Sequence, residues 1–258
     1  MALVSQKEPF QAVYPTGLVM PHGAVGWHRS AFDTDIDAAL EQVCEDGGWV
    51  AHLAADDTIE CVSAGAGDTT QTLYVRGIDT NNKVRIESFA IAGVAPVLSA
   101  VKFRYVECAW LDAECANNIT VRRTTGPANI LVITAGQLQS YCVHHFNGEF
   151  TSYITGLYMG AGGTMTDSVN LELRHYPDDL DSRDLGDGYL KLIEPTIHVF
   201  QGAVGSSVGG ARMANPPPFV FPQPIRIPAG SYITLYGIGE AANQDVWAFM
   251  QGFDVIEE

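Results

Sequence analysis

The sequence predicts an all-β protein, a jelly-roll-like antiparallel β-sandwich, and three observations support this. Short runs rich in Val, Ile, Thr, Tyr and Phe recur at intervals of roughly 10–15 residues with turn residues between them, as in sandwiches. No helical pattern separates these runs, as a parallel α/β sheet would require. Hydrophobic residues make up 47% of the 258 residues and charged residues 17%, a balance that suits a folded chain with a sizeable core.

The chain begins with residues 1–32, which we expect to form an irregular, extended arm. Prolines and glycines punctuate this stretch and oppose helix or central-strand structure. The arm nevertheless carries much apolar surface, which is typical of an interaction site. Packing on the arm's own domain is the alternative to packing on a neighbouring subunit. The predicted interface residues are Phe10, Tyr14, Leu18, Met20 and Trp27.

One short helix is predicted near residues 33–45. Asp33 or Thr34 can cap it and acidic residues fill its first turn, while Ile36 and Val43 recur on one face at helical spacing. Such a short helix would plug one end of the sandwich.

Strand patterns follow from about residue 49 to the end. TLYVRGID and KVRIESFAIAG flank an Asp-Thr-Asn-Asn turn and are predicted to form a hairpin. The other predicted strands lie in TIECVSA, VKFRYVECAWL, NITVRRT, ILVITAG, SYCVHHF, TSYITGLYM, VNLELRHY, LIEPTIHVF, IRIPAGSYITLYGIG and VWAFMQGFDVI. The predicted sandwich domain spans residues 33–258, and the alternative is two sandwiches that divide near residue 136.

Charge and hydropathy narrow the possible partners. The formal net charge is −16 and no basic patch is visible, so nucleic acid is not an expected partner. No apolar run reaches the ~18 residues of a membrane-spanning helix, so no membrane association is expected. The first residues lack a basic start followed by an apolar run, so we expect no secretory signal.

The five cysteines, an odd number without a predicted secretory signal, favour free thiols over a disulfide framework. They are Cys44, Cys61, Cys108, Cys115 and Cys142.

Metal and cofactor sites are not predicted. The Asp-rich loop at residues 178–187 does not follow the EF-hand spacing and is interpreted as solvated, with an ion site as the open alternative. His144 and His145 are adjacent on a predicted strand, so their side chains should point to opposite faces. Cys108 and Cys115 do not have the spacing of a zinc site.

Catalytic residues are not predicted either. The Gly-rich stretch at residues 205–210 lacks the lysine and the spacing of a P-loop and is interpreted as a flexible loop. No pair of carboxylates stands out as a candidate for glycoside hydrolysis. We therefore expect a protein that is not an enzyme.

Residues 48–258 resemble a pattern in virion proteins of tailed bacteriophages, especially marine ones. The matching positions are Gly77, Asp79, Glu87, Gly93 and Phe103, followed by NITVRR, ITAGQLQS, TSYITGLYM and the Pro-Ala-Gly hairpin within PIRIPAGSYITLYGIG. One departure is HHFNGEF, which stands where the family has Val-Pro-Ala-Gly before the mid-chain strand. These are turn and strand motifs, so the resemblance implies no catalytic residue.

The resemblance implies a head-associated component of a phage particle. We expect a capsid decoration or cement protein on the virion surface, made in the cytoplasm of the host bacterium. Its expected partners are the major capsid protein and further copies of itself, such as a trimer. The alternatives are a neck, tail or fibre-associated virion protein and, in a different class, a carbohydrate-binding module.

Overall fold

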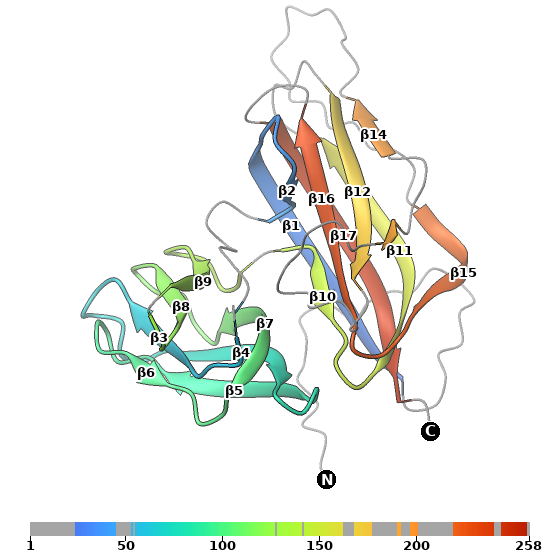
Figure 1. The fold of residues 1–258 in the computed structure, drawn as a ribbon. Coiled ribbons are helices and arrows are strands. Elements are labelled where there is room, and N and C mark those ends of the chain that lie inside the picture. The colour runs from blue at the N-terminus through green and yellow to red at the C-terminus, as the bar shows by residue number, and fades with distance from the viewer. Residues whose placement is uncertain are drawn as a thin grey trace, which may run out of the picture.

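The structure is a computed structural model, and all of its regular elements in the described residues are β-strands (Figure 1). The prediction of an all-β fold is confirmed. The described residues are 24–44, 53, 55–126, 128–140, 142–161, 168–176, 190–191, 197–200, 219–239 and 244–256. The Asp-rich loop and the Gly-rich stretch at residues 205–210 lie outside them.

Two sheets form a large unit, which combines both ends of the described chain. One sheet has the order β1-β17-β11-β15; the other has the order β10-β16-β12-β13, with β14 on β12 and β2 on β16. Their bounds are β1 Val25–Ile36, β2 Glu41–Gln42, β10 His144–Phe146, β11 Thr151–Ala161, β12 Ser168–Tyr176, β13 Leu190–Lys191, β14 Ile197–Phe200, β15 Phe219–Ile227, β16 Tyr232–Gly239 and β17 Gln244–Val255.

The strands of the large unit pair in a nested order. The first strand, β1, pairs with the last, β17; β2 and β10 pair with β16, β11 with β15, and β12 with β14. This is the strand order of a double-sheet jelly roll. Inward-facing residues of both sheets meet in one core, for example Met250 of β17 and Leu173 of β12.

A second, smaller unit is inserted between β2 and β10 and spans residues 53–140. Its sheets have the orders β6-β3-β8-β9 and β5-β4-β7 and enclose a separate core around Leu73, Phe89 and Phe103. The strands are β3 Ile59–Ser63, β4 Thr72–Asp79, β5 Val84–Ala90, β6 Val97–Leu98, β7 Phe103–Leu111, β8 Ile119–Arg123 and β9 Asn129–Ile133. We call it the inserted unit.

The insertion changes the predicted domain organisation. The single sandwich expected over residues 33–258 is replaced by two units with separate cores. The chain passes from the inserted unit to the large unit close to the alternative boundary at residue 136. It also crosses earlier, after Cys44, because β1 belongs to the same sheet as β17 (Figure 1).

The helix predicted near residues 33–45 is wrong, and so is the arm boundary at residue 32. β1 runs from Val25 to Ile36 as a strand because β17 offers it a hydrogen-bonding partner along this length. Tertiary pairing therefore overrides the local helical pattern. The Asp33 carboxylate accepts hydrogen bonds from the backbone N–H groups of Asp35 and Cys44, at 3.2 and 3.0 Å, in place of capping a helix.

The predicted hairpin of the inserted unit is confirmed by the pairing of β4 with β5. Asp79 Oδ1 accepts hydrogen bonds from the backbone N–H groups of Asn81 and Lys83, at 2.8 and 3.0 Å, which stabilises the turn. At Gly77 a Cβ would lie 2.3 Å from the backbone oxygen of Tyr105, so only glycine fits there.

Candidate functional site

A disulfide joins the two segments in which the chain crosses between the units. Cys44, just after β2, and Cys142, just before β10, form this bond at a sequence separation of 98. The expectation that the cysteines are free is therefore wrong for these two, and Cys61, Cys108 and Cys115 are free. Sequence spacing gave no indication of the bond, because the whole inserted unit separates its partners.

Glu107 of β7, in the inserted unit, contributes a fully buried carboxylate to the junction. Its Oε1 accepts hydrogen bonds from Arg29 Nη2 at 2.7 Å and from the backbone N–H of Phe146 at 3.2 Å, both in the large unit. Its Oε2 forms an ion pair with Arg76 of β4. His145 Nδ1 lies 2.7 Å from Oε1. One carboxylate thus connects both units.

Asp254 of β17 is the second buried carboxylate at this junction. Its Oδ1 accepts hydrogen bonds from Trp27 Nε1 at 2.8 Å and from Ser152 Oγ at 2.5 Å, and it lies 3.1 Å from His145 Nε2. Arg76 Nη2 lies 3.9 Å from Oδ2. We call Arg29, Arg76, Glu107, His145 and Asp254 the buried charge cluster.

The buried charge cluster is balanced, because two guanidinium groups face two carboxylates. A proton on His145 would add an uncompensated charge. Burial, together with Arg29 and Arg76, outweighs the attraction of Asp254 and lowers the pKa of His145 from 6.5 to about 4. Burial alone would raise the pKa of Asp254, but His145, Ser152 and Arg76 hold it below its usual range. The lowered pKa favours the neutral ring, in which only one of the two ring nitrogens can donate to a carboxylate.

The arrangement includes the order of nucleophile, base and acid that serine hydrolases use. Ser152 Oγ lies 3.3 Å from His145 Nε2, and Glu107 lies on the other ring nitrogen. Both Ser152 and His145, however, are 0% exposed, and the serine hydroxyl donates to Asp254. A substrate carbonyl would reach this serine only if the two units separated. The geometry is that of a structural junction.

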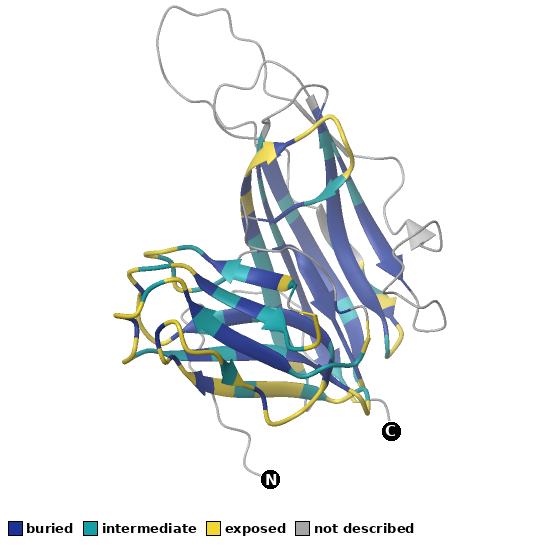
Figure 2. Ribbon diagram, turned by 60° about the vertical axis from the view of Figure 1, so that its left-hand side comes forward, coloured by how far each residue is buried: buried dark blue, intermediate teal, exposed yellow. Residues whose placement is uncertain are grey.

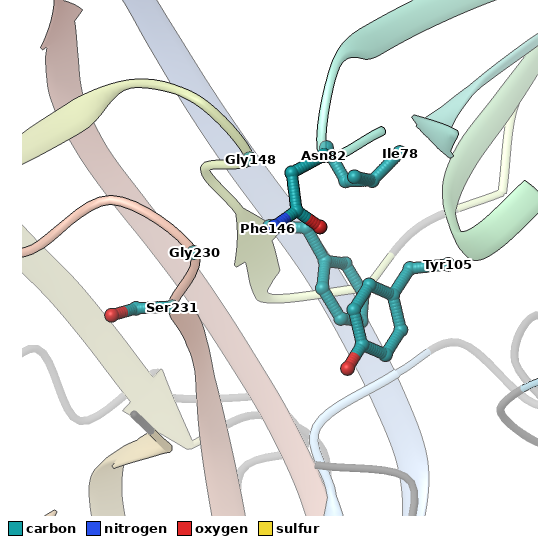
Figure 3. Close-up of a pocket in the computed structure, with 7 residues that line it drawn as sticks. All are labelled: Ile78, Asn82, Tyr105, Phe146, Gly148, Gly230 and Ser231. Carbon is teal, nitrogen blue, oxygen red and sulfur yellow. The ribbon is translucent and has the colours of Figure 1, made fainter. Parts of the chain in front are cut away.

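Aromatic packing extends the junction beside the charges. Phe146 of β10 stacks on Tyr105 of β7, with ring centroids 4.5 Å apart, and on Tyr232 of β16 at 4.2 Å. Next to these rings, Asn82 and Ile78 of the inserted unit face the turns of the large unit across a small pocket (Figure 3). The pocket has room for about one water molecule.

Asn147 fixes the Pro-Ala-Gly turn of the large unit. Its side-chain Nδ2 donates to the carbonyl of Pro228 at 2.6 Å, and its Oδ1 accepts from the backbone N–H of Ser231 at 2.7 Å. Gly230 has a φ of 78° and its N–H donates to the carbonyl of Gly148 at 2.6 Å. The turns that precede β11 and β16 therefore support each other.

The predicted interface residues are placed only in part. Phe10, Tyr14, Leu18 and Met20 lie outside the described residues. Trp27 is not on an arm: it lies on β1, is 4% exposed, and stacks on His145 at 4.1 Å. His145 and His144 point to opposite faces of β10, as predicted, because His144 contacts the backbone carbonyl of Glu107 and the ring of Tyr232.

Within the described residues, no group of three or more His, Cys, Asp or Glu side chains is arranged to hold a metal ion. The same residues contain no helix of the length and hydropathy needed to cross a membrane.

Neither a family model nor a curated protein sequence matches this chain. Among solved structures, one similar chain comes from the structure of infectious bursal disease virus Gt strain. It is 10% identical, with 93% of this chain and 73% of that chain covered, at a TM-score of 0.17. A TM-score this low is no evidence for a shared fold.

The lowered pKa of His145 predicts that its contribution to stability depends on pH. In the unfolded chain His145 takes up a proton near pH 6.5, whereas in the folded chain it does so only near pH 4. Between these values the unfolded state binds more protons, so stability is lost as the pH falls. The gap corresponds to roughly 3 kcal/mol.

We expect the stability advantage of the natural chain over His145→Gln to shrink by roughly this amount from neutral pH to about pH 4. Urea unfolding of both proteins across that range measures it. Burial also lowers the pKa of His144, and burial and Asp35 raise the pKa of Asp33 to about 8. Asp33 is present in both proteins and cancels in the difference, whereas His145 helps to lower the pKa of His144 and of Asp254, so the contributions of these two groups change with it. An advantage that grows toward acid would instead mean that Glu107 and Asp254 share a protonated ring.

Proposed function

We propose that this chain is a non-catalytic structural protein of a phage particle, most specifically a capsid decoration or cement protein that bridges major capsid subunits. The observation that carries the proposal is the nested strand order of the large unit, because viral capsid domains are among the proteins built as jelly rolls. The resemblance of residues 48–258 to phage virion proteins supports the same function.

The junction between the units fits this function. Glu107 is fully buried between Arg29 and Arg76, and the Cys44–Cys142 bond joins the two crossings of the chain. Both features fix the inserted unit relative to the large unit, which suits a subunit that must present two surfaces at a set distance. Disulfides also persist on virion surfaces, outside the reducing cytosol.

A carbohydrate-binding module is the second candidate, and one observation favours it. Aromatic side chains form a row on the outer face of the sheet with β1, β17 and β11, where Phe249 stacks on His28 and contacts the edge of Tyr158. Phe32 on the same face is 44% exposed. Jelly rolls also serve as lectins.

Electron cryo-microscopy of purified particles, with quantitative mass spectrometry of the copy number, tests the proposal. A decoration protein should be present in copies comparable to those of the major capsid protein and should lie on the capsid lattice. Far fewer copies at the neck or tail would favour the neck, tail or fibre alternative. Binding of the isolated chain on a glycan array, lost in Phe249→Ala, would favour the carbohydrate-binding module.

A further inference from the structure

Within the described residues, strand β5 is an open edge of the inserted unit. It is the last strand of the described sheet β5-β4-β7 and lies along the lower margin of that unit in Figure 1. Four of its seven residues are exposed, and Ile86, next to its central residue, is 50% exposed. The view in Figure 2 shows largely exposed ribbon along this margin. An exposed strand edge offers unpaired backbone groups to another strand.

The free backbone groups of this edge belong to alternate residues. The odd-numbered residues of β5 direct their backbone N–H and C=O groups toward β4. The hydrogen bonds from Asp79 N to the Lys83 carbonyl and from Ile91 N to the Gln71 carbonyl, at the two ends of the pairing, show this. Backbone groups alternate in direction along a strand. The N–H and C=O groups of residues 84, 86 and 88 therefore point away from β4, and among the described residues none of them has a hydrogen-bond partner.

We propose that β5 pairs antiparallel with β5 of a second copy of this chain, with the two-fold axis at Ile86. This register places Ile86 opposite Ile86 of the second copy as a hydrogen-bonded pair. It places Val84 opposite Ser88 of the second copy in the same way. A two-fold axis between residues would not align the outward-facing groups of both strands, so the direction of these groups places the axis at a residue. An axis at Arg85 or at Glu87 would place like charges directly opposite one another.

Charge selects Ile86 as the centre. In this register Arg85 lies directly opposite Glu87 of the second copy, and symmetry repeats the pair, so two ion pairs form across the new ladder. Arg85 is 49% exposed in its side chain and uses Nε for Asp79, at 2.8 Å. Glu87 Oε1 accepts a hydrogen bond from the backbone N–H of Ala100, and Oε2 is buried without a hydrogen-bond partner in the described part of the chain. To meet the guanidinium group of the second copy, the Glu87 side chain would turn outward from this position.

Ile86 is among the exposed large hydrophobic residues of the described chain. Closing the edge would bury Ile86 against its symmetry mate. The result is an isologous dimer, in which one patch contacts itself. This inference is independent of the proposed function in virions.

Cysteine cross-linking tests the register. Opposite residues of a hydrogen-bonded antiparallel pair have Cα atoms about 5.5 Å apart, within the range for disulfides. In a Cys108→Ser background, which removes the partly exposed free thiol, Ile86→Cys should form a covalent dimer under mild oxidation. Leu98→Cys is the matched control, because Leu98 is 61% exposed but is not part of β5. This variant should not form the covalent dimer. Equal cross-linking of both variants, or none of Ile86→Cys, would overturn the proposal.

Reversing the charges of Arg85 and Glu87 tests whether the partner is a second copy of this chain. Sedimentation of the full chain from micromolar to millimolar concentration measures the association. Arg85→Glu and Glu87→Arg each place like charges opposite one another and should raise the dimer dissociation constant roughly tenfold. The double variant R85E/E87R should restore association, although it loses both intrachain contacts. Thermal melts verify folding of each variant. A chain that stays monomeric, or a double variant that associates no better than the single ones, contradicts the proposal.

Discussion

Replacing Glu107 with Gln should lower the free energy of unfolding by about 3–5 kcal/mol, because it leaves buried positive charge without its partner. The Glu107 side chain is 0% exposed, and those of Arg29 and Arg76 are 14% and 15% exposed. After the substitution only Asp254 remains to balance the two guanidinium groups. Equilibrium unfolding in urea measures the loss, and hydrogen exchange at β7 and β10 locates it at the junction.

The exposed ion pair between Lys83 and Glu149 provides a matched control, since it also joins the inserted unit to the large unit. Its side chains are 53% and 38% exposed, and the charged atoms lie 3.0 Å apart. Glu149→Gln should cost no more than about 1 kcal/mol, as exposed pairs usually do. Removing Arg76 as well as Glu107 should recover part of the loss. If Glu107→Gln costs no more than Glu149→Gln, the buried charge cluster does not hold the units together.

Local patterns predicted the strands well where pairing is also local. The hairpin of β4 and β5 follows from alternating residues around a turn that Asp79 stabilises through its own side chain. The Pro-Ala-Gly turn before β16 was instead expected from the resemblance to phage virion proteins. Gly230 adopts a positive φ there, but β15 and β16 lie in different sheets and form no hairpin. For β4 and β5, the residues that determine the structure lie within a few positions of one another.

The predicted helix failed because its competitor is far away in the sequence. Ile36 and Val43 are both fully buried, which fits a helical face as well as two separate β contacts. What decides between them is β17, which pairs with β1 across more than 200 residues of sequence. No property of the segment itself reveals that partner, so the acidic residues were interpreted as a helix cap.

The buried charge cluster could not be predicted for a related reason. Its members come from β1, β4, β7, β10 and β17, and each taken alone has the pattern of an ordinary surface charge. The stretch HHFNGEF contributes His145, which contacts both buried carboxylates, and Asn147, which fixes the neighbouring turn. Neither role is visible in the stretch itself, because the two carboxylates come from β7 and β17.

Removing the disulfide should produce the second large loss of stability, about 2–4 kcal/mol. The bond between Cys44 and Cys142 closes a loop of 98 residues. In the chain-entropy model a loop of about 100 residues gives up to about 4.7 kcal/mol, because the cross-link restricts the unfolded state. The double variant C44S/C142S, and the natural chain with reductant, should both unfold at lower urea concentration than the oxidised chain.

Cys108→Ser is the control, because this free cysteine is partly exposed and lies outside the bond. This substitution should change the free energy of unfolding only slightly. Adding reductant should then destabilise the Cys108→Ser variant as much as it destabilises the natural chain. Burial raises the pKa of Cys61 well above its usual value and that of Cys115 to about 11, so both thiols react slowly in the folded state. Alkylation of the denatured, unreduced chain should therefore be used to count thiols. It should label Cys61, Cys108 and Cys115 alone, and labelling of all five cysteines in oxidised protein would show that the crossings are not bonded.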